Sequence, residues 1–262
     1  MELKNLAIVQ ARLGSTRLPK KVLKKINDKT LIEILLERLS KSSFIDKIIV
    51  ATTDNDYDDE LVEHIKSLSI DTFRGDCDNV LDRFYRAALK YKPQNIIRIT
   101  GDCPLIDPIL VDDVIEDFLD SNVDYLCNNY PPTFPDGMDI EVFSFFALEY
   151  AFFNAEDDYD LEHVTPFIRR SKQFNINTYK SDFDYSKYRW TVDEKLDFEL
   201  IKEIFIYFSP DILFSWKKIL KLFEKKPELF DINKNISRNE GSKIGTGQKL
   251  YKRAKNIIPG GT

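Results

Sequence analysis

The sequence predicts an α/β protein with a mixed, mostly parallel sheet and helices on both faces. Short apolar runs that end in polar loops recur in the first half of the chain, at residues 6–9, 47–52 and 95–100. Segments with helical apolar spacing lie between these runs, and such alternation is typical of parallel sheets. The chain has 262 residues, of which 43% are hydrophobic and 31% charged, so it can bury a full core.

The first predicted strand leads into a basic loop that contains a glycine. The cations of this loop are Arg12, Arg17, Lys20 and Lys21. Gly14 lets the backbone approach a ligand closely, and Ser15 adds a hydroxyl and a backbone donor. A basic loop after a buried strand suits a polyphosphate. Composition alone also allows a solvated surface loop, and the glycine–lysine spacing is not that of a Walker loop.

The next elements continue the alternation. Thr30 and Glu33 fit a capping box, which predicts a helix over about residues 30–41. Asp78 fits the cap of a later helix. The other helices predicted in this half cover residues 57–68, 78–91 and 108–120, and the strands cover 47–52, 71–74, 95–100 and 123–127.

The alternation changes after residue 127. A proline-containing loop over 128–137 precedes a strand of alternating polarity at 139–143. The remaining predicted helices cover 145–154, 160–171, 196–208 and 216–225, and the remaining strands cover 175–180 and 188–192. From about Asn235 the composition becomes that of a linker.

Two aspartates follow predicted strands. Asp102 comes after strand 95–100 and Gly101, and Asp193 follows strand 188–192. Ligands of open α/β sheets sit at the carboxyl ends of the strands, so we expect Asp102 and the basic loop to face one cleft. Carboxylate oxygens beside a phosphate loop suit Mg²⁺. Taken separately, each aspartate could instead be a helix cap or a turn residue.

The order of these motifs resembles a known family. Residues 10–23, Gln-Ala-Arg-x-Gly-Ser-x-Arg-Leu-Pro-x-Lys-Val-Leu, closely resemble the first motif of the SpsF-type spore-coat polysaccharide cytidylyltransferases, and more loosely that of the CMP-sugar-acid synthetases. Four further stretches resemble later motifs in the family's order, at 98–108, 135–143, 162–166 and 189–197. The chain departs from the pattern after Asp193, where Glu-Lys-Leu leaves the start of the next helix open.

The resemblance implies a three-layer, Rossmann-like fold of the nucleotide-diphospho-sugar transferase type. It also implies cytidylyl transfer, in which an acceptor oxygen attacks the α-phosphate of a nucleoside triphosphate and pyrophosphate leaves. CTP is favoured by the likeness, and the acceptor would be a sugar, a sugar acid or a phosphorylated small molecule. The product would serve surface polysaccharide or glycoconjugate synthesis.

The resemblance also implies roles for individual residues. It places Mg²⁺ on Asp102 and Asp193. It places Arg12 and Lys21, rather than the adjacent Lys20, on the departing phosphates. The residues that it assigns to the nucleotide are Ala11, Gly14, Ser15, Gly75, Asp78 and Arg83. Those that it assigns to the acceptor are Asp139, Glu141 and His163. Alternatively, Asp139 and Glu141 could lie on the water-facing side of a strand. His163 could instead be a helix residue that packs beside the cleft.

Two other classes of protein remain open. A glycosyltransferase of related fold would use an already activated sugar, but this class prefers an Asp-x-Asp metal motif, which Thr100-Gly101-Asp102 lacks. A nucleotide-binding regulatory module would not need Lys21 together with two metal-binding aspartates.

Composition bounds the location and the partners. The net charge of −6 argues against general nucleic-acid binding. No apolar run reaches membrane-spanning length, and the start of the chain lacks the apolar core of a signal peptide. Cys77, Cys103 and Cys127 fit no zinc pattern and suggest free thiols. We therefore expect a cytoplasmic protein that acts on small molecules.

The end of the chain predicts a second unit. Residues 248–262, Gln-Lys-Leu-Tyr-Lys-Arg-Ala-Lys-Asn-Ile-Ile-Pro-Gly-Gly-Thr, resemble the opening of glutamate-1-semialdehyde aminomutase-like aminotransferases. We expect a nucleotidyltransferase domain over 1–236, and over 237–262 a linker and the start of a fused aminotransferase-like domain. An amphipathic tail helix that docks on the first domain is the alternative. A homodimer also stays open, because the aromatic residues over 143–153 suit a core or a dimer surface.

Overall fold

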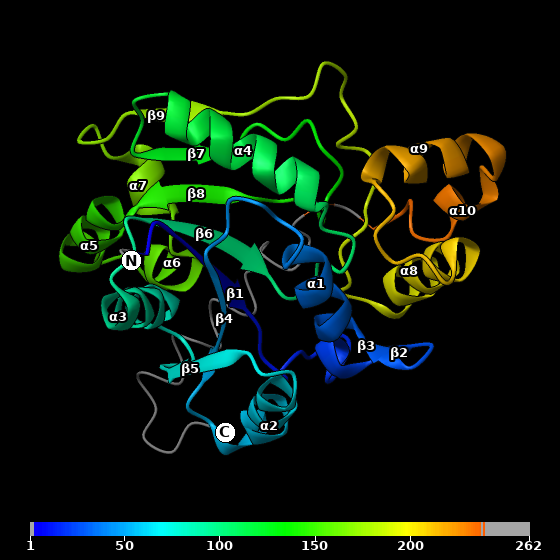
Figure 1. Ribbon diagram of the computed structural model, residues 1–262, viewed down its shortest axis with the longest axis horizontal. Coiled ribbons are helices and arrows are strands. Elements are labelled where there is room, and N and C mark those ends of the chain that lie inside the picture. The colour runs from blue at the N-terminus through cyan, green and yellow to red at the C-terminus, as the bar shows by residue number, and fades with distance from the viewer. Residues whose placement is uncertain (1–2, 237, 239–262) are drawn as a thin grey trace, which may run out of the picture.

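The computed structural model describes residues 3–236 and residue 238 (Figure 1). Within them, the main sheet has seven strands in the order β5-β4-β1-β6-β8-β7-β9, and a small hairpin pairs β2 with β3. The strands of the main sheet are β1 (Asn5–Gln10), β4 (Lys47–Thr53), β5 (Asp71–Gly75), β6 (Asn95–Thr100), β7 (Tyr125–Cys127), β8 (Glu141–Ser144) and β9 (Ile176–Thr178). Those of the hairpin are β2 (Lys25–Ile26) and β3 (Lys29–Thr30).

The strand directions explain why the site gathers at one edge of the sheet. β1 pairs in parallel with β4 and β6, whereas β8 runs antiparallel to both β6 and β7. Gln10 and Thr100 are register partners, so the loops after β1 and β6 leave the sheet side by side. Gly101 permits this approach, because a Cβ there would lie 2.8 Å from Ala11 Cβ.

Helices cover both faces of the sheet. Along β1, Leu6 and Ile8 point into one buried cluster and Ala7 and Val9 into the other. The helices that contribute to the Ala7 cluster are α1 (Leu31–Leu39), α2 (Asp59–Ser67), α4 (Pro108–Asp120), α8 (Lys195–Phe208), α9 (Trp216–Lys225) and α10 (Glu228–Asp231). Those on the Leu6 side are α3 (Val80–Tyr91), α5 (Phe145–Asn154), α6 (Asp158–His163) and α7 (Pro166–Arg170). The predicted mixed, mostly parallel sheet with helices on both faces is confirmed.

Local capping explains several element boundaries. Thr30 Oγ1 accepts from the Glu33 amide at 3.2 Å, and the Glu33 carboxylate accepts from the Thr30 amide at 3.4 Å, which forms the predicted box before α1. The predicted cap at Asp78 is wrong by one position. The Asn79 side chain accepts from the Asp82 amide at 2.9 Å and begins α3. After Asp193, Glu194 caps α8 through a capping box with Asp197.

Two predicted elements differ from the structure. The single helix expected over 160–171 is broken into α6 and α7 at Val164, whose φ of 70° and ψ of −56° form a γ-turn closed by a hydrogen bond from the Thr165 amide to the His163 carbonyl. The strand expected over 188–192 is absent from the described residues, where only an isolated bridge joins Asp136 to Arg189. Trp190 and Val192 are nevertheless fully buried, without a strand partner.

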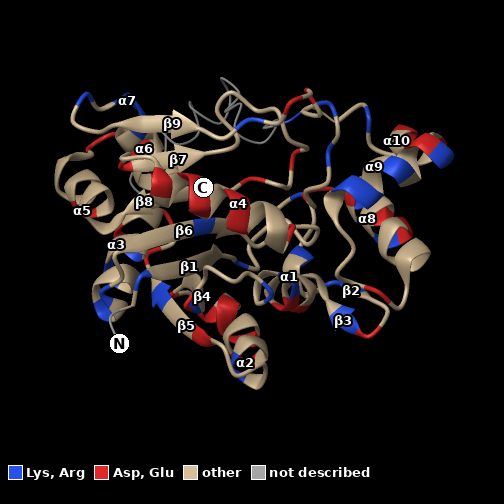
Figure 2. Cartoon of the chain, turned by 45° about the horizontal axis from the view of Figure 1, so that its top comes forward, with Lys and Arg blue, Asp and Glu red and all other residues tan. Residues whose placement is uncertain are grey.

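Charges of both signs spread over the helices. Acidic residues gather on α4 and lysines on α9 (Figure 2). No helix in the described part of the chain is both long and apolar enough to cross a membrane. The linker, the aminotransferase-like start and the alternative docked tail fall outside the described residues, apart from Arg238.

Candidate active site

The loop after β1 is held in place by a buried carboxylate from another segment. Asp58 Oδ1 accepts from the Leu13 amide at 2.7 Å, and its Oδ2 accepts from the hydroxyls of Thr52 and Thr53. Asp58 is only 2% exposed, so the loop rests on a fixed anchor. Asp58 falls inside the helix predicted over 57–68, and this contact could not be predicted because nothing local to residue 58 links it to residue 13.

A cavity of about 360 Å³, called here the loop cavity, lies over this loop. Its lining includes Ala11, Arg12, Gly14, Ser15, Arg17, Lys21, Asp102 and Asp193. A Cβ at Gly14 would meet nothing within 4 Å, so the backbone there borders open space. The amide of Ser15 instead donates to the Leu13 carbonyl at 2.8 Å. In this structure Ser15 therefore offers the cavity its side chain rather than the backbone donor expected from the sequence.

Lys21 lies between the two predicted metal ligands. Its Nζ is 2.6 Å from Asp102 Oδ2 and 2.7 Å from Asp193 Oδ1. Burial lowers the pKa of Lys21, but the two carboxylates outweigh burial and raise it above its usual value. Burial likewise raises the pKa of Asp102, and Lys21 outweighs this and holds it at about 2. Lys21 and Asp102 are thus both charged at neutral pH.

The adjacent Lys20 points elsewhere. Lys20 has a φ of 53°, in the left-handed region, and this directs its side chain away from that of Lys21. Its ammonium group pairs with Glu60, and the side chain is 46% exposed, against 12% for Lys21.

Arg189 binds the Asp193 oxygen that Lys21 does not contact. This buried guanidinium donates to Asp136 at 2.8 Å, to Asp193 Oδ2 at 3.0 Å and to both oxygens of Asp197 at 3.0 Å. Asn233 donates to Asp197 Oδ1 at 2.9 Å and to the Arg189 carbonyl. Arg189 and Asp197 were expected only as parts of the motif over 189–197, because the contact between them depends on the folded chain and not on a local pattern.

A second cavity, of about 530 Å³, adjoins the start of α3 and is called here the α3 cavity. Its lining includes Gln10, Arg12, Asp76, Cys77, Asp78, Asn79, Arg83, Glu162 and His163. Arg83 is 1% exposed and donates to the Asp76 carbonyl at 3.1 Å. Gly75 does not line this cavity. A Cβ there would lie 3.2 Å from Arg83 Cγ, so Gly75 makes room for Arg83.

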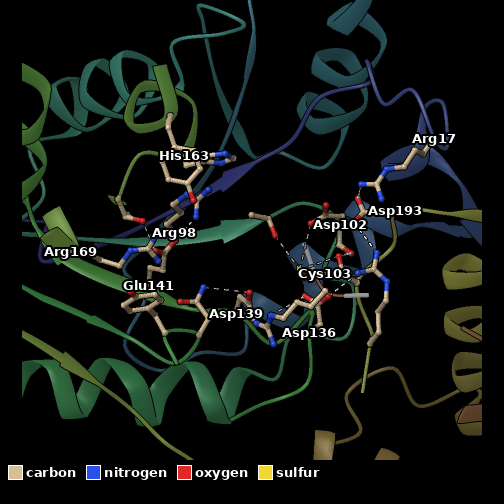
Figure 3. A pocket seen from close by; sticks show the side chains of 18 residues that line it. Arg17, Arg98, Asp102, Cys103, Asp136, Asp139, Glu141, His163, Arg169 and Asp193 are labelled. Carbon is tan, nitrogen blue, oxygen red and sulfur yellow. Dashed lines mark hydrogen bonds and ion pairs between the residues drawn. The ribbon is translucent and has the colours of Figure 1, made fainter. Parts of the chain in front are cut away.

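A third cavity, of about 430 Å³, opens beside the amino end of β8 and is called here the β8 cavity (Figure 3). Asp139, Glu141 and His163, the residues expected to bind the acceptor, all line it. Asp102 and Asp193 line both the loop cavity and the β8 cavity, and Arg12 lines both the loop cavity and the α3 cavity. The three cavities therefore adjoin one another, and the two aspartates lie where the loop cavity meets the β8 cavity.

Glu141 is buried rather than on the wet side of a strand. It is 2% exposed, and its Oε1 accepts from the hydroxyls of Tyr125 and Thr165, both at 2.6 Å. Arg98 pairs with its Oε2. The solvent-facing alternative is thus wrong for Glu141. Both oxygens of Glu141 already have partners within the protein. The Glu141 carboxylate therefore borders the cavity without a free oxygen to offer a ligand in this structure.

Asp139 and His163 lie in different settings within the β8 cavity. Asp139 precedes β8 and pairs with Arg238 at 2.5 Å. His163 ends α6, and its ring centroid lies 4.5 Å from that of Tyr159. Burial lowers the pKa of His163, so the ring is neutral at pH 7. His163 lines both the α3 cavity and the β8 cavity. It is thus a helix residue beside the cleft, and it is also placed where it could contact the acceptor.

Comparison of the sequence with known proteins finds a matching family model and relatives that align over most of their length. A family model described as cytidylyltransferase covers residues 6–236. The protein MJ1063 of Methanocaldococcus jannaschii is 41% identical over 89% of this chain and 96% of its own. The spore coat polysaccharide biosynthesis protein SpsF of Bacillus subtilis is 35% identical over 85% and 95%.

A solved structure agrees as well. A cytidylyltransferase from Leptospira borgpetersenii superimposes with a TM-score of 0.83 at 34% identity, over 87% of this chain and 97% of that one. The resemblance seen in the sequence motifs is thereby confirmed. This chain belongs to the cytidylyltransferase family and is a nucleotidyltransferase.

Proposed function

We propose that this protein is a Mg²⁺-dependent cytidylyltransferase that joins the CMP part of CTP to a small-molecule acceptor and releases pyrophosphate. The observation that carries the proposal is that Asp102 and Asp193 line both the loop cavity and the β8 cavity and hold the Lys21 ammonium group between them. The likeness to SpsF supports a role in the synthesis of a surface polysaccharide or glycoconjugate.

The two aspartates suit a magnesium ion. No group of three or more histidine, cysteine and acidic side chains that could hold a metal occurs among the described residues. Mg²⁺ does not require one, because it usually takes one or two carboxylates and completes its shell with water and phosphate oxygens. Asp102 Oδ2 and Asp193 Oδ1 already converge on one cation, the Lys21 ammonium. A bound Mg²⁺ would neutralise charge on the α-phosphate.

The basic loop suits the triphosphate. Gly14 lets the backbone approach the phosphates, and Arg12 and Lys21, which both line the loop cavity, would bind the β- and γ-phosphates. Negative charge grows on the departing pyrophosphate, and cations fixed in place stabilise it without reorganising. Arg12 also reaches the α3 cavity, where Asp78 and Arg83 would bind the ribose and base.

The β8 cavity suits the acceptor. It shares Asp102 and Asp193 with the loop cavity, so an acceptor there presents an oxygen to the α-phosphate across the two aspartates. Asp139 and His163 would contact its hydroxyl groups, and Glu141 would fix Arg98 beside it. Catalysis then comes from positioning and charge neutralisation, with no covalent intermediate on the protein.

A nucleotide screen tests the proposal. CTP, GTP, UTP and ATP are each incubated with Mg²⁺ and a panel of sugars, sugar acids and sugar phosphates, and pyrophosphate and conjugates are measured. We expect pyrophosphate from CTP together with a CMP conjugate. Nucleotide-sugars are incubated in parallel. If the protein hydrolyses them or transfers their sugar, and releases no pyrophosphate from any triphosphate, it is a glycosyltransferase instead. Tight nucleotide binding without turnover of either kind of substrate would show a regulatory module.

A further inference from the structure

Cys77 differs from the other two cysteines of the described chain. Cys103 is 3% exposed and Cys127 is 1% exposed, and burial raises the pKa of both thiols. Cys77 is partly exposed and lines the α3 cavity, and all three cysteines are free thiols. A thiol must be accessible to react, so Cys77 is the cysteine that a reagent in solution can reach.

Two arginines lie beside the Cys77 sulfur. Arg12 Nη1 donates to Cys77 Sγ at 3.5 Å. Burial and the neighbouring Arg12 lower the pKa of Arg83, and Cys77 is close enough to favour the charged form of Arg83. Cys77 also stands two residues before Asn79, the cap of α3, where the helix dipole adds positive potential. Cations and helix starts are typical surroundings of reactive thiols.

The charges of these two arginines are not neutralised by the protein. Neither Arg12 nor Arg83 forms an ion pair with any residue that the structure describes. Arg83 is 1% exposed, and its Nε has no hydrogen-bond partner among those residues. The Asp76 carboxylate pairs with neither arginine and accepts instead from two amides of the loop before α3, at 2.8 and 2.6 Å. Since buried donors are nearly always paired in native structures, the open donor of Arg83 indicates an anionic ligand in this cavity.

The α3 cavity has room for a group attached to Cys77. Its volume of about 530 Å³ lies in the range of pockets that hold small molecules. Arg12, Cys77 and Arg83 all line it. A carboxylate on the attached group would therefore meet the two arginines, and the group would occupy the space that the proposed function gives to the ribose and base of CTP.

We propose that Cys77 is a modification site for small disulfides that carry carboxylates, and that the modification excludes CTP. The Cys77 thiol gives its proton to solvent, and the thiolate attacks one sulfur of the reagent. The S–S bond of the reagent breaks, a new S–S bond forms to Cys77 Sγ, and the other half leaves as a thiolate. Cys77 is oxidised and the departing half is reduced, so the disulfide itself is the oxidant. Attack by a second thiol reverses the step. The modification is independent of the proposed function, whereas the exclusion of CTP rests on it.

Mass spectrometry of the intact wild-type protein tests the site. The protein is incubated with anionic dithiodipropionate, neutral bis(hydroxyethyl) disulfide or cationic cystamine, and peptide mapping locates the added mass. Each rate is divided by that of N-acetylcysteinamide with the same reagent, which removes differences in intrinsic reactivity. A charge-assisted hydrogen bond supports roughly tenfold or more in affinity, so the normalised rate should favour dithiodipropionate over the neutral reagent by that factor. Cystamine should be the slowest of the three, and dithiothreitol should restore the original mass.

Variants assign the reaction to Cys77 and its charge preference to the arginines. Cys77→Ser should gain no mass in the folded state. Arg12→Met should lower the preference for the anionic reagent, and Arg86→Met, on the exposed side of α3, should keep it. The site is refuted by equal normalised rates for the anionic and neutral reagents, by an unchanged preference in Arg12→Met, or by a wild-type protein that gains no mass at Cys77.

Calorimetry with CTP and Mg²⁺ tests the consequence. Protein that carries the mixed disulfide should bind CTP roughly tenfold or more weakly than untreated protein, because the attached group fills the α3 cavity. Cys77→Ser exposed to the same reagent should bind CTP as tightly as untreated Cys77→Ser. Undiminished CTP binding by the modified protein would overturn the exclusion. If untreated protein fails to bind CTP, the proposed function fails, and the mass measurements still decide whether Cys77 is a modification site.

Discussion

The ammonium group of Lys21 lies 2.6 Å from Asp102 Oδ2, although the two residues are 81 positions apart in the sequence. Asp193 Oδ1 lies 2.7 Å from the same ammonium nitrogen. One cation is thus held between two carboxylates, of which Asp102 follows β6 and Asp193 precedes α8, at the point where the loop cavity meets the β8 cavity. Four predictions follow from this arrangement and from its surroundings.

Removing either carboxylate should abolish turnover without unfolding the protein. Asp102→Asn and Asp193→Asn each leave a neutral oxygen where Mg²⁺ would bind, so pyrophosphate release from CTP should fall roughly 100-fold or more. Mn²⁺ binding followed by electron paramagnetic resonance should weaken in parallel. Asp120→Asn, at the exposed end of α4, is the matched control. Near-wild-type turnover at saturating Mg²⁺ would remove the residue concerned from the metal site.

Much of the fold could be predicted because it depends on local patterns. The strand over 95–100 and the helix over 108–120 have the predicted bounds. The strand carries three isoleucines within six residues, and the helix begins at Pro108 behind the cap Asp107, which accepts from the Ile109 amide at 2.9 Å. The basic loop and Asp102 were also expected to meet, since both follow strands that leave the sheet at one edge.

The misses share a different cause. A strand was expected over 188–192, but a ladder needs a neighbouring strand, and among the described residues only Asp136 bridges this segment. Val164 breaks a predicted helix with a positive φ that β-branched residues rarely adopt, so no propensity indicated it. Asp58 and Arg189 matter through contacts with distant segments, which no local pattern shows.

The end of the first domain can be tested by truncation. Cutting the chain after Ile236 should leave the melting temperature and CTP binding nearly unchanged, as expected for a domain over 1–236. Acceptor affinity should fall, because Arg238 pairs with Asp139 at 2.5 Å and approaches Asp136 at 3.8 Å. A matched cut after Asn239 keeps Arg238 and should restore acceptor affinity. A large drop in melting temperature with both cuts would show instead that the tail is a structural part of the first domain.

The stability of the protein should depend on pH through His163. Burial lowers the pKa of this ring in the folded state below its usual value of 6.5. The unfolded chain therefore takes up a proton first as the pH falls. The stability due to His163 is present above pH 6.5 and is lost as the pH drops through the depressed pKa. His163→Gln should thus show a smaller fall in melting temperature between pH 7 and pH 5 than the wild type, and parallel curves would contradict this account.

The adjacent lysines test the central claim most directly. Lys21 faces the aspartates and the loop cavity, whereas Lys20 pairs with Glu60 at the surface. A cation that binds the departing phosphates acts mainly on the transition state, so its loss should lower turnover more than CTP affinity. In single-turnover assays of pyrophosphate release from CTP, Lys21→Met should be about 100- to 1000-fold slower, which corresponds to ~2.7–4 kcal/mol. Lys20→Met should change the rate by only a few-fold. The account is contradicted if Lys20→Met is the damaging variant, or if Lys21→Met turns over at the wild-type rate.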